Sequence, residues 1–123
     1  MRTAQRPFVA TSTVFAALAL FSACSNDTST DGTTVTVTAT DTSCELSDTS
    51  LSAGSFTFEV TNKGASVTEL YVYGGGDRVM GEVENVGPGI TQKFDVTLDA
   101  GTYEAACKPG MTGDGIRTPF KVA

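Results

Sequence analysis

The chain has 123 residues, 40% of them hydrophobic and 18% charged, with three cysteines, no histidine and a formal net charge of −6 at pH 7. An excess of 14 acidic over 8 basic residues argues against nucleic acid as a partner. The lack of histidine removes the Ser-His-Asp set and any imidazole base, so we expect a binding protein and not an enzyme.

Residues 1–23 are predicted to be a lipoprotein signal peptide. Two arginines precede an uncharged run over residues 8–21, which is too short for a membrane-spanning helix. The run leads into residues 20–24 (Leu-Phe-Ser-Ala-Cys), which resemble a bacterial lipobox, so we expect cleavage before Cys24 and lipidation of its thiol. Ordinary signal cleavage is the alternative, and it fits less well because Phe21 stands where a small residue is wanted.

Residues 24–33 are predicted to be a lipid-anchored flexible tether, because no apolar side chain follows the cysteine. The remaining residues, 34–123, are enough for one small domain. Loss of the signal would leave six basic against 14 acidic residues, a net charge of about −8 that favours solubility and attracts cations. We expect an exported protein, periplasmic or on the outer cell surface, that meets the membrane through its lipid only.

Short strands separated by turns are predicted throughout residues 34–123. Residues 34–39 and 55–61 alternate apolar and polar side chains, which is the period of a half-buried strand. Five further strands are expected at residues 67–73, 78–86, 92–98, 101–107 and 116–122. Gly-, Pro- and Asn-containing turns separate them, and no segment has a helical period. The pattern predicts an all-β, antiparallel Greek-key sandwich of about seven or eight strands.

The alternation also assigns side chains to faces. Those expected in the core are Val35, Val37, Phe56, Phe58, Val60, Phe94, Val96 and Leu98. On residues 101–107, Cys107 shares a face with Tyr103 and Ala105 and should point inward at the end of its strand. Tyr71 and Tyr73 share a face, where they cover the edge of the sandwich or contribute to a partner surface.

Residues 101–113 resemble the copper-binding strand and loop of a cupredoxin, with Cys107 as the thiolate and Met111 as the axial thioether. Glu69 stands near the place where cupredoxins carry their first histidine, after the Asn-Lys-Gly turn at residues 62–64. A blue-copper centre needs two imidazole nitrogens beside its cysteine, so none is expected here.

Five stretches together resemble the cupredoxin-like domain of the bacterial iron-uptake component EfeO: residues 35–45, 60–64, 69–72, 81–89 and 100–107. The resemblance implies a cupredoxin fold and a role in iron acquisition, with an iron-uptake permease or companion envelope proteins as partners. It also implies metal sites around the cysteine pair and nearby acidic residues. EfeO continues into a helical domain with a His-x-x-Glu motif, which this sequence lacks, and we expect a separate polypeptide to supply that part.

The candidate metal ligands are Cys44, Glu69, Glu82, Glu84, Cys107 and Met111, with Glu45 a weaker candidate. Thiolate and thioether sulfur favour Cu(I), whereas carboxylates favour iron, so the expected cofactor is an iron or copper ion. Glu82 and Glu84 lie two apart on a predicted strand, and their side chains should project from one face about 6.5–7 Å apart along the chain. They would bridge a hydrated cation or form a solvated strand face that opposes aggregation.

Cys44 and Cys107 form a pair in an oxidising compartment once Cys24 carries a lipid. A disulfide between them would constrain the unfolded chain by about 4 kcal/mol in the loop-entropy model. A thiolate metal site is the alternative, and a redox-dependent exchange between the two is a third. The sequence thus supports two functions: a lipoprotein that binds iron or copper ions in support of iron uptake, or a disulfide-stabilised module without metal that recognises an envelope protein.

Overall fold

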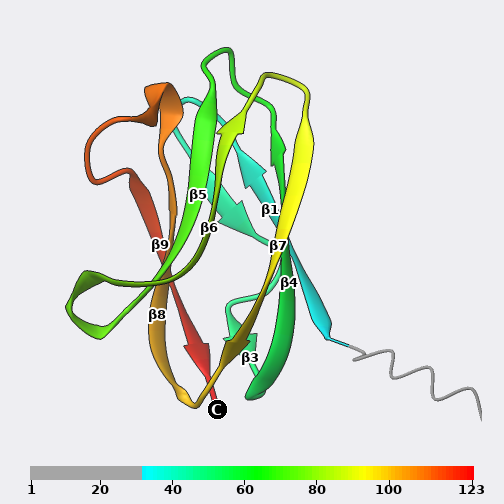
Figure 1. Ribbon diagram of the computed structural model, residues 1–123, viewed down its shortest axis with the longest axis vertical. Helices are drawn as coiled ribbons and strands as arrows, with labels where there is room; N and C mark the ends of the chain where they lie inside the picture. The colour runs from blue at the N-terminus through cyan, green and yellow to red at the C-terminus, as the bar shows by residue number, and fades with distance from the viewer. Residues whose placement is uncertain (1–31) are drawn as a thin grey trace, which may run out of the picture.

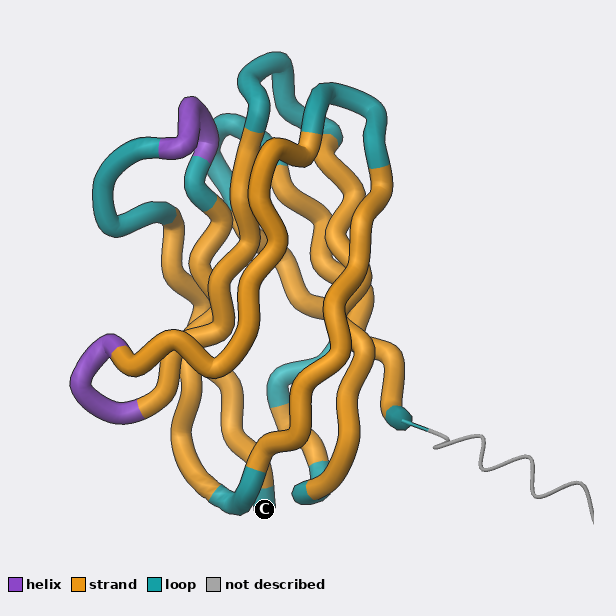
Figure 2. The backbone as a smooth tube through the Cα atoms, in the orientation of Figure 1, coloured by secondary structure: helices purple, strands orange, loops and turns teal. Residues whose placement is uncertain are grey.

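The computed structural model describes residues 32–123, which form a β-sandwich (Figures 1 and 2). The strands are β1 (Thr33–Ala39), β2 (Cys44–Leu46), β3 (Ser50–Leu51), β4 (Gly54–Asn62), β5 (Thr68–Gly74), β6 (Arg78–Val86), β7 (Thr91–Leu98), β8 (Gly101–Cys107) and β9 (Ile116–Val122). Two short 3-10 helices, η1 (Gly75–Asp77) and η2 (Pro109–Met111), interrupt them. The predicted signal peptide, and the predicted tether as far as residue 31 including Cys24, lie outside the described residues.

The nine strands are divided between a four-stranded sheet of order β2-β1-β4-β7 and a five-stranded sheet of order β3-β9-β8-β5-β6. The all-β sandwich is therefore confirmed. Strands β2 and β3 were not among the predicted elements, because three and two residues are too few to show a period. Among residues 32–123, no helix has the length and apolar character needed to cross a membrane.

The prediction of an entirely antiparallel sandwich is wrong for two strand pairs. Strand β1 runs parallel to β4, and β3 runs parallel to β9. The chain enters the five-stranded sheet at β3 before it returns to the first sheet at β4, so no hairpin links β1 to β4 and antiparallel pairing is not imposed. Side-chain alternation reports which face a residue occupies and carries no information on strand direction.

The core between the sheets contains the side chains that the alternation assigned to it. Val35, Val37, Phe56, Phe58, Val60 and Leu98 are buried, and Phe94 and Val96 pack against them at the edge. Phe58 lies at the centre, with ring centroids 5.7 Å from those of Phe94 and Phe120. Among residues 32–123, the buried core residues lie between Val35 and Val122, so residues 25–123 include every core residue that the structure describes.

Two contacts show how closely the sheets fit. A Cβ on Gly81 of β6 would lie 2.5 Å from Cε2 of Phe94, so only glycine permits this approach of β6 to β7. Where β7 leads into β8, the Tyr103 hydroxyl donates a hydrogen bond of 2.7 Å to the carbonyl of Asp99. This tyrosine corner fixes the turn between β7 and β8.

Loops 40–43, 63–67, 87–90 and 108–115 gather at one end of the sandwich, at the top of Figure 1. Buried Asn62 organises this end, since its Nδ2 donates to the carbonyls of Ser66 (2.8 Å) and Val86 (2.9 Å). Asp41 accepts hydrogen bonds from the backbone N–H groups of Ala65 and Ser66, which lower the pKa of its carboxyl. These bonds fix the chain where it enters β5.

Candidate functional site

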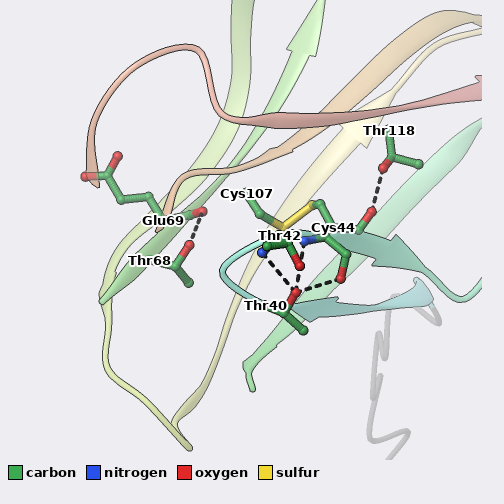
Figure 3. Close-up of a disulfide and its surroundings, with 8 residues drawn as sticks. Thr40, Thr42, Cys44, Thr68, Glu69, Cys107 and Thr118 are labelled. Atoms are coloured by element: carbon green, nitrogen blue, oxygen red, sulfur yellow. Dashed lines mark hydrogen bonds between the residues drawn. A yellow bond between two sulfur atoms is a disulfide. The ribbon is translucent and has the colours of Figure 1, made fainter. Parts of the chain in front are cut away.

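Cys44 and Cys107 form a disulfide that joins the two sheets at the loop end (Figure 3). Cys44 opens β2 and Cys107 closes β8, with their Cα atoms 5.5 Å apart. Both are buried, with exposures of 4% and 0%. The hydroxyl of Thr118 donates to the carbonyl of Cys44 and holds β2 against the neighbouring sheet. Of the alternatives left open by the sequence, the disulfide is the one that the structure contains.

The bridge changes what the two cysteines can do chemically. In a disulfide neither sulfur is a thiolate, and the thiolate is the form that binds metals. The chain also contains no histidine. The residues therefore do not fit a blue-copper centre, and in the bridged state Cys44 and Cys107 do not act as ligands.

The remaining candidate ligands do not converge on the disulfide. Figure 3 shows the Glu69 side chain pointing away from the sulfur atoms. Met111 lies in the loop after β8 with 39% of its surface exposed. Glu45 is exposed on β2, next to the buried Cys44 and on the opposite face of the strand. The predicted set is thus distributed over several places in the fold.

Three of the predicted ligands do come together, on the outer face of the five-stranded sheet. Leu70 is buried in the core, so its neighbours Glu69 and Tyr71 on β5 project outward. On the adjacent edge strand β6, Glu82 pairs directly with Tyr71. The Tyr71 hydroxyl donates a hydrogen bond of 2.9 Å to Oε1 of Glu84.

A bulge in β6 lies beside this group. The register between β5 and β6 shifts between Thr68 and Leu70, opposite Glu84 and Asn85. Asn85 adopts a positive φ of 56°, a conformation that asparagine tolerates better than most residues. Tyr71 pairs with Glu82 and Leu70 with Val83 just before the bulge, so alternation places Glu84 on the same outer face as Glu82, diagonal to Tyr71.

We refer to Glu69, Tyr71, Glu82, Glu84 and Lys108 as the Tyr71 cluster. Burial, and then the charges of Glu84 and Glu82, raise the pKa of the Glu69 carboxyl, while Lys108 acts in the opposite direction. The hydrogen bond to Glu84, together with burial and the neighbouring carboxylates, raises the pKa of the Tyr71 hydroxyl. The Lys108 ammonium lies 4.0 Å from the centre of the Tyr71 ring. The three carboxylates of the cluster thus repel one another, and the positive charge of Lys108 offsets this repulsion only in part.

Within residues 32–123, no three histidine, cysteine, aspartate or glutamate side chains are arranged to hold a metal ion. The Tyr71 cluster nevertheless has oxygen donors of the type that hard cations accept, namely carboxylates and a phenol. Sequence reasoning did not include the Tyr71 hydroxyl among the ligands. The sequence could have indicated it, because Glu69 and Tyr71 alternate with apolar residues on one strand and therefore share a face.

Comparison with known proteins finds a matching domain family and a set of relatives. The sequence model described as "Cupredoxin-like domain" matches residues 12–117. The "Iron uptake system component EfeO" of Escherichia coli (strain K12) is 34% identical over 89 residues, which are 72% of this chain and 24% of that protein. EfeO of Shigella flexneri matches with the same identity and coverage. The chain therefore spans about a quarter of the length of these curated relatives.

Among solved structures, the chain is similar to dithionite-reduced auracyanin from the photosynthetic bacterium Roseiflexus castenholzii. The TM-score is 0.58, the sequence identity is 15%, and the match covers 75% of this chain and 98% of auracyanin. At this identity the similarity concerns the fold and does not extend to the site.

Proposed function

The chain belongs to the cupredoxin-like domain family as an EfeO-type member, and we propose that it is an exported protein that binds a metal ion. This binding would support iron uptake, without catalysis by the chain itself. The names of its relatives support the connection to iron. Lipidation at Cys24 would keep the protein at a membrane surface, within reach of a permease or companion envelope protein. Because the chain spans a quarter of EfeO, this proposal concerns one domain's contribution to uptake.

The observation that carries the proposal is that Glu69, Glu82 and Glu84 share the outer face of β5 and β6, where the Tyr71 hydroxyl donates a hydrogen bond to Glu84. Their mutual repulsion is what raises the pKa of Glu69 after burial itself, and a bound cation would relieve it. Carboxylate and phenol oxygens are hard ligands, which suit iron better than Cu(I). With the two cysteines joined, Met111 is the one soft donor left among the predicted ligands. We therefore place iron before copper.

Isothermal titration of residues 25–123 with Fe(III), Fe(II), Cu(II) and Cu(I) tests this function. We expect Fe(III) to bind, and a Glu82→Gln/Glu84→Gln variant to lose most of that affinity. A Glu59→Gln/Asp95→Asn variant removes the same charge from outward positions on the four-stranded sheet and should bind as the wild type does. If no metal bound more tightly than about 100 μM, the metal-binding function would be excluded.

A second candidate is a binding module that recognises another envelope protein without metal. The observation that favours it is the buried disulfide, which occupies the cysteine that a cupredoxin would offer to copper. Removal of metal with EDTA separates the two functions. Binding of an envelope protein that persists in EDTA would support this module, whereas binding that requires the metal would contradict it.

A further inference from the structure

The two outer faces of the sandwich differ in composition. On the four-stranded sheet, the outward positions of β4 and β7 carry hydroxyls that bond across the strands, such as Ser55 with Thr97 and Thr61 with Thr91. This is an ordinary solvated face. The outer face of the five-stranded sheet carries two tyrosines, a lysine and an arginine in contact with one another. Tyrosine and arginine are enriched where protein interfaces bury most of their binding energy.

These four side chains form a row on that face. The rings of Tyr71 and Tyr73 stack with centroids 5.5 Å apart and planes within 9°. Lys108 lies over Tyr71 at 4.0 Å, and the Arg117 guanidinium lies over Tyr73 at 4.4 Å. Neighbouring Ala106 on β8 is completely buried. Side chains packed in this way lose little further entropy when a partner binds.

Charge differs between the two ends of the row. Arg117 is neutralised by Asp77 (2.7 Å) and Glu104 (3.1 Å). At the other end, the Tyr71 cluster contains three carboxylates and one lysine, Lys108, which leaves excess negative charge beside a half-exposed aromatic ring. A partner surface that complements this end must supply positive charge.

We propose that the outer face of β5 and β6, centred on Tyr71, docks a protein partner that presents a cluster of exposed arginine and lysine side chains. The carboxylates of Glu82 and Glu84 accept hydrogen bonds from a guanidinium of the partner, which lies beside the Tyr71 ring, while Lys108 and Tyr73 keep their places against the ring. This inference rests on the second candidate function, recognition of an envelope protein, and needs no bound metal.

The probe is N-acetylated, C-amidated tetra-arginine, titrated into ¹⁵N-labelled residues 25–123 in the presence of EDTA. We expect saturable NMR shift changes concentrated on the amides of β5 and β6, with little change on β1, β4 and β7. Glu82→Gln/Glu84→Gln should weaken peptide binding by about fivefold, while Glu59→Gln/Asp95→Asn, with the same net charge, should change the peptide affinity by less than about twofold.

Three results would overturn the proposal: shift changes of equal size on both outer faces, equal weakening by the two double variants, or no saturable change up to about 5 mM peptide. The first two would mean that the net negative charge alone attracts the peptide. Because EDTA removes metal from this assay, a negative metal titration refutes metal binding and leaves the docking result unaffected. A positive metal titration with dispersed peptide shifts refutes docking alone.

Discussion

Removal of the disulfide gives the sharpest test of how this small domain is stabilised. Cys44 and Cys107 are separated by 63 positions, and they connect opposite sheets. In the chain-entropy model, a loop of this size destabilises the unfolded state by about 4 kcal/mol at 25 °C. A domain of this length has a total unfolding free energy of about 5–14 kcal/mol. The bridge therefore accounts for a large part of the stability, and the domain without it should still fold.

Urea unfolding of residues 25–123 measures this contribution in three forms: oxidised, reduced, and Cys44→Ala/Cys107→Ala. Because the bridge is buried, the reduced form should be prepared by unfolding in dithiothreitol and refolding in its presence. The reduced protein keeps both sulfur atoms in the core, so its difference from the oxidised form isolates the cross-link. The alanine variant should lose a further 1–2 kcal/mol or so, because it also leaves small cavities.

Two observations would refute this reasoning. Titration of two reactive thiols in the denatured, unreduced protein would show that the bridge is absent. A urea midpoint that did not change on reduction would show that the cross-link does not limit the unfolded chain as the loop model requires. The slope of the unfolding free energy against urea should also rise on reduction, because an uncrosslinked chain exposes more surface.

Three further variants test other contacts, each by urea unfolding. Tyr103→Phe should cost about 1–2 kcal/mol because the carbonyl of Asp99 loses its donor; an unchanged midpoint would mean that water replaces the hydroxyl. Gly81→Ala should cost about 1–3 kcal/mol because its methyl group meets the ring of Phe94, and a neutral result would show that β6 shifts freely. Asp41→Asn should lower the midpoint at pH 7, since a carboxyl whose pKa is lowered by folding stabilises the fold above its unfolded pKa. That difference should disappear as the pH falls through the folded pKa, and a difference independent of pH would contradict the charge-based explanation.

The core was predictable because it depends on local alternation, and the topology was not. The positions of Val35, Val37, Phe56 and Phe58 follow from a period of two, which the sheets preserve. Strand direction depends on where the chain changes sheets. That change occurs around β2 and β3, which are too short to carry a pattern. The parallel pairing of β1 with β4 thus depends on a segment that shows no sequence period from which a strand could be predicted.

The candidate site was only partly predictable for a related reason. That Glu82 and Glu84 project from one face follows from their spacing on β6, but their approach to Tyr71 depends on the register of β6 against β5. Register is a property of two strands together and cannot be obtained from either one. Cys107 was correctly expected to point inward, whereas the choice between disulfide and thiolate depends on the distance to Cys44 on the other sheet.

The disulfide and the Tyr71 cluster lie on opposite sides of the five-stranded sheet, and this separation determines how the proposed metal binding would behave. A cupredoxin-type ligand at Cys107 would be enclosed by the core, where exchange of the metal requires movement of the loops. The carboxylates of Glu82 and Glu84 are exposed on an edge strand, so an ion held there keeps part of its water shell and exchanges without any change in the fold. Binding at such a position suits transfer between proteins better than storage. Since the proposed docking face includes the same carboxylates, a basic partner and a cation would compete for them, and docking would then promote release of the ion.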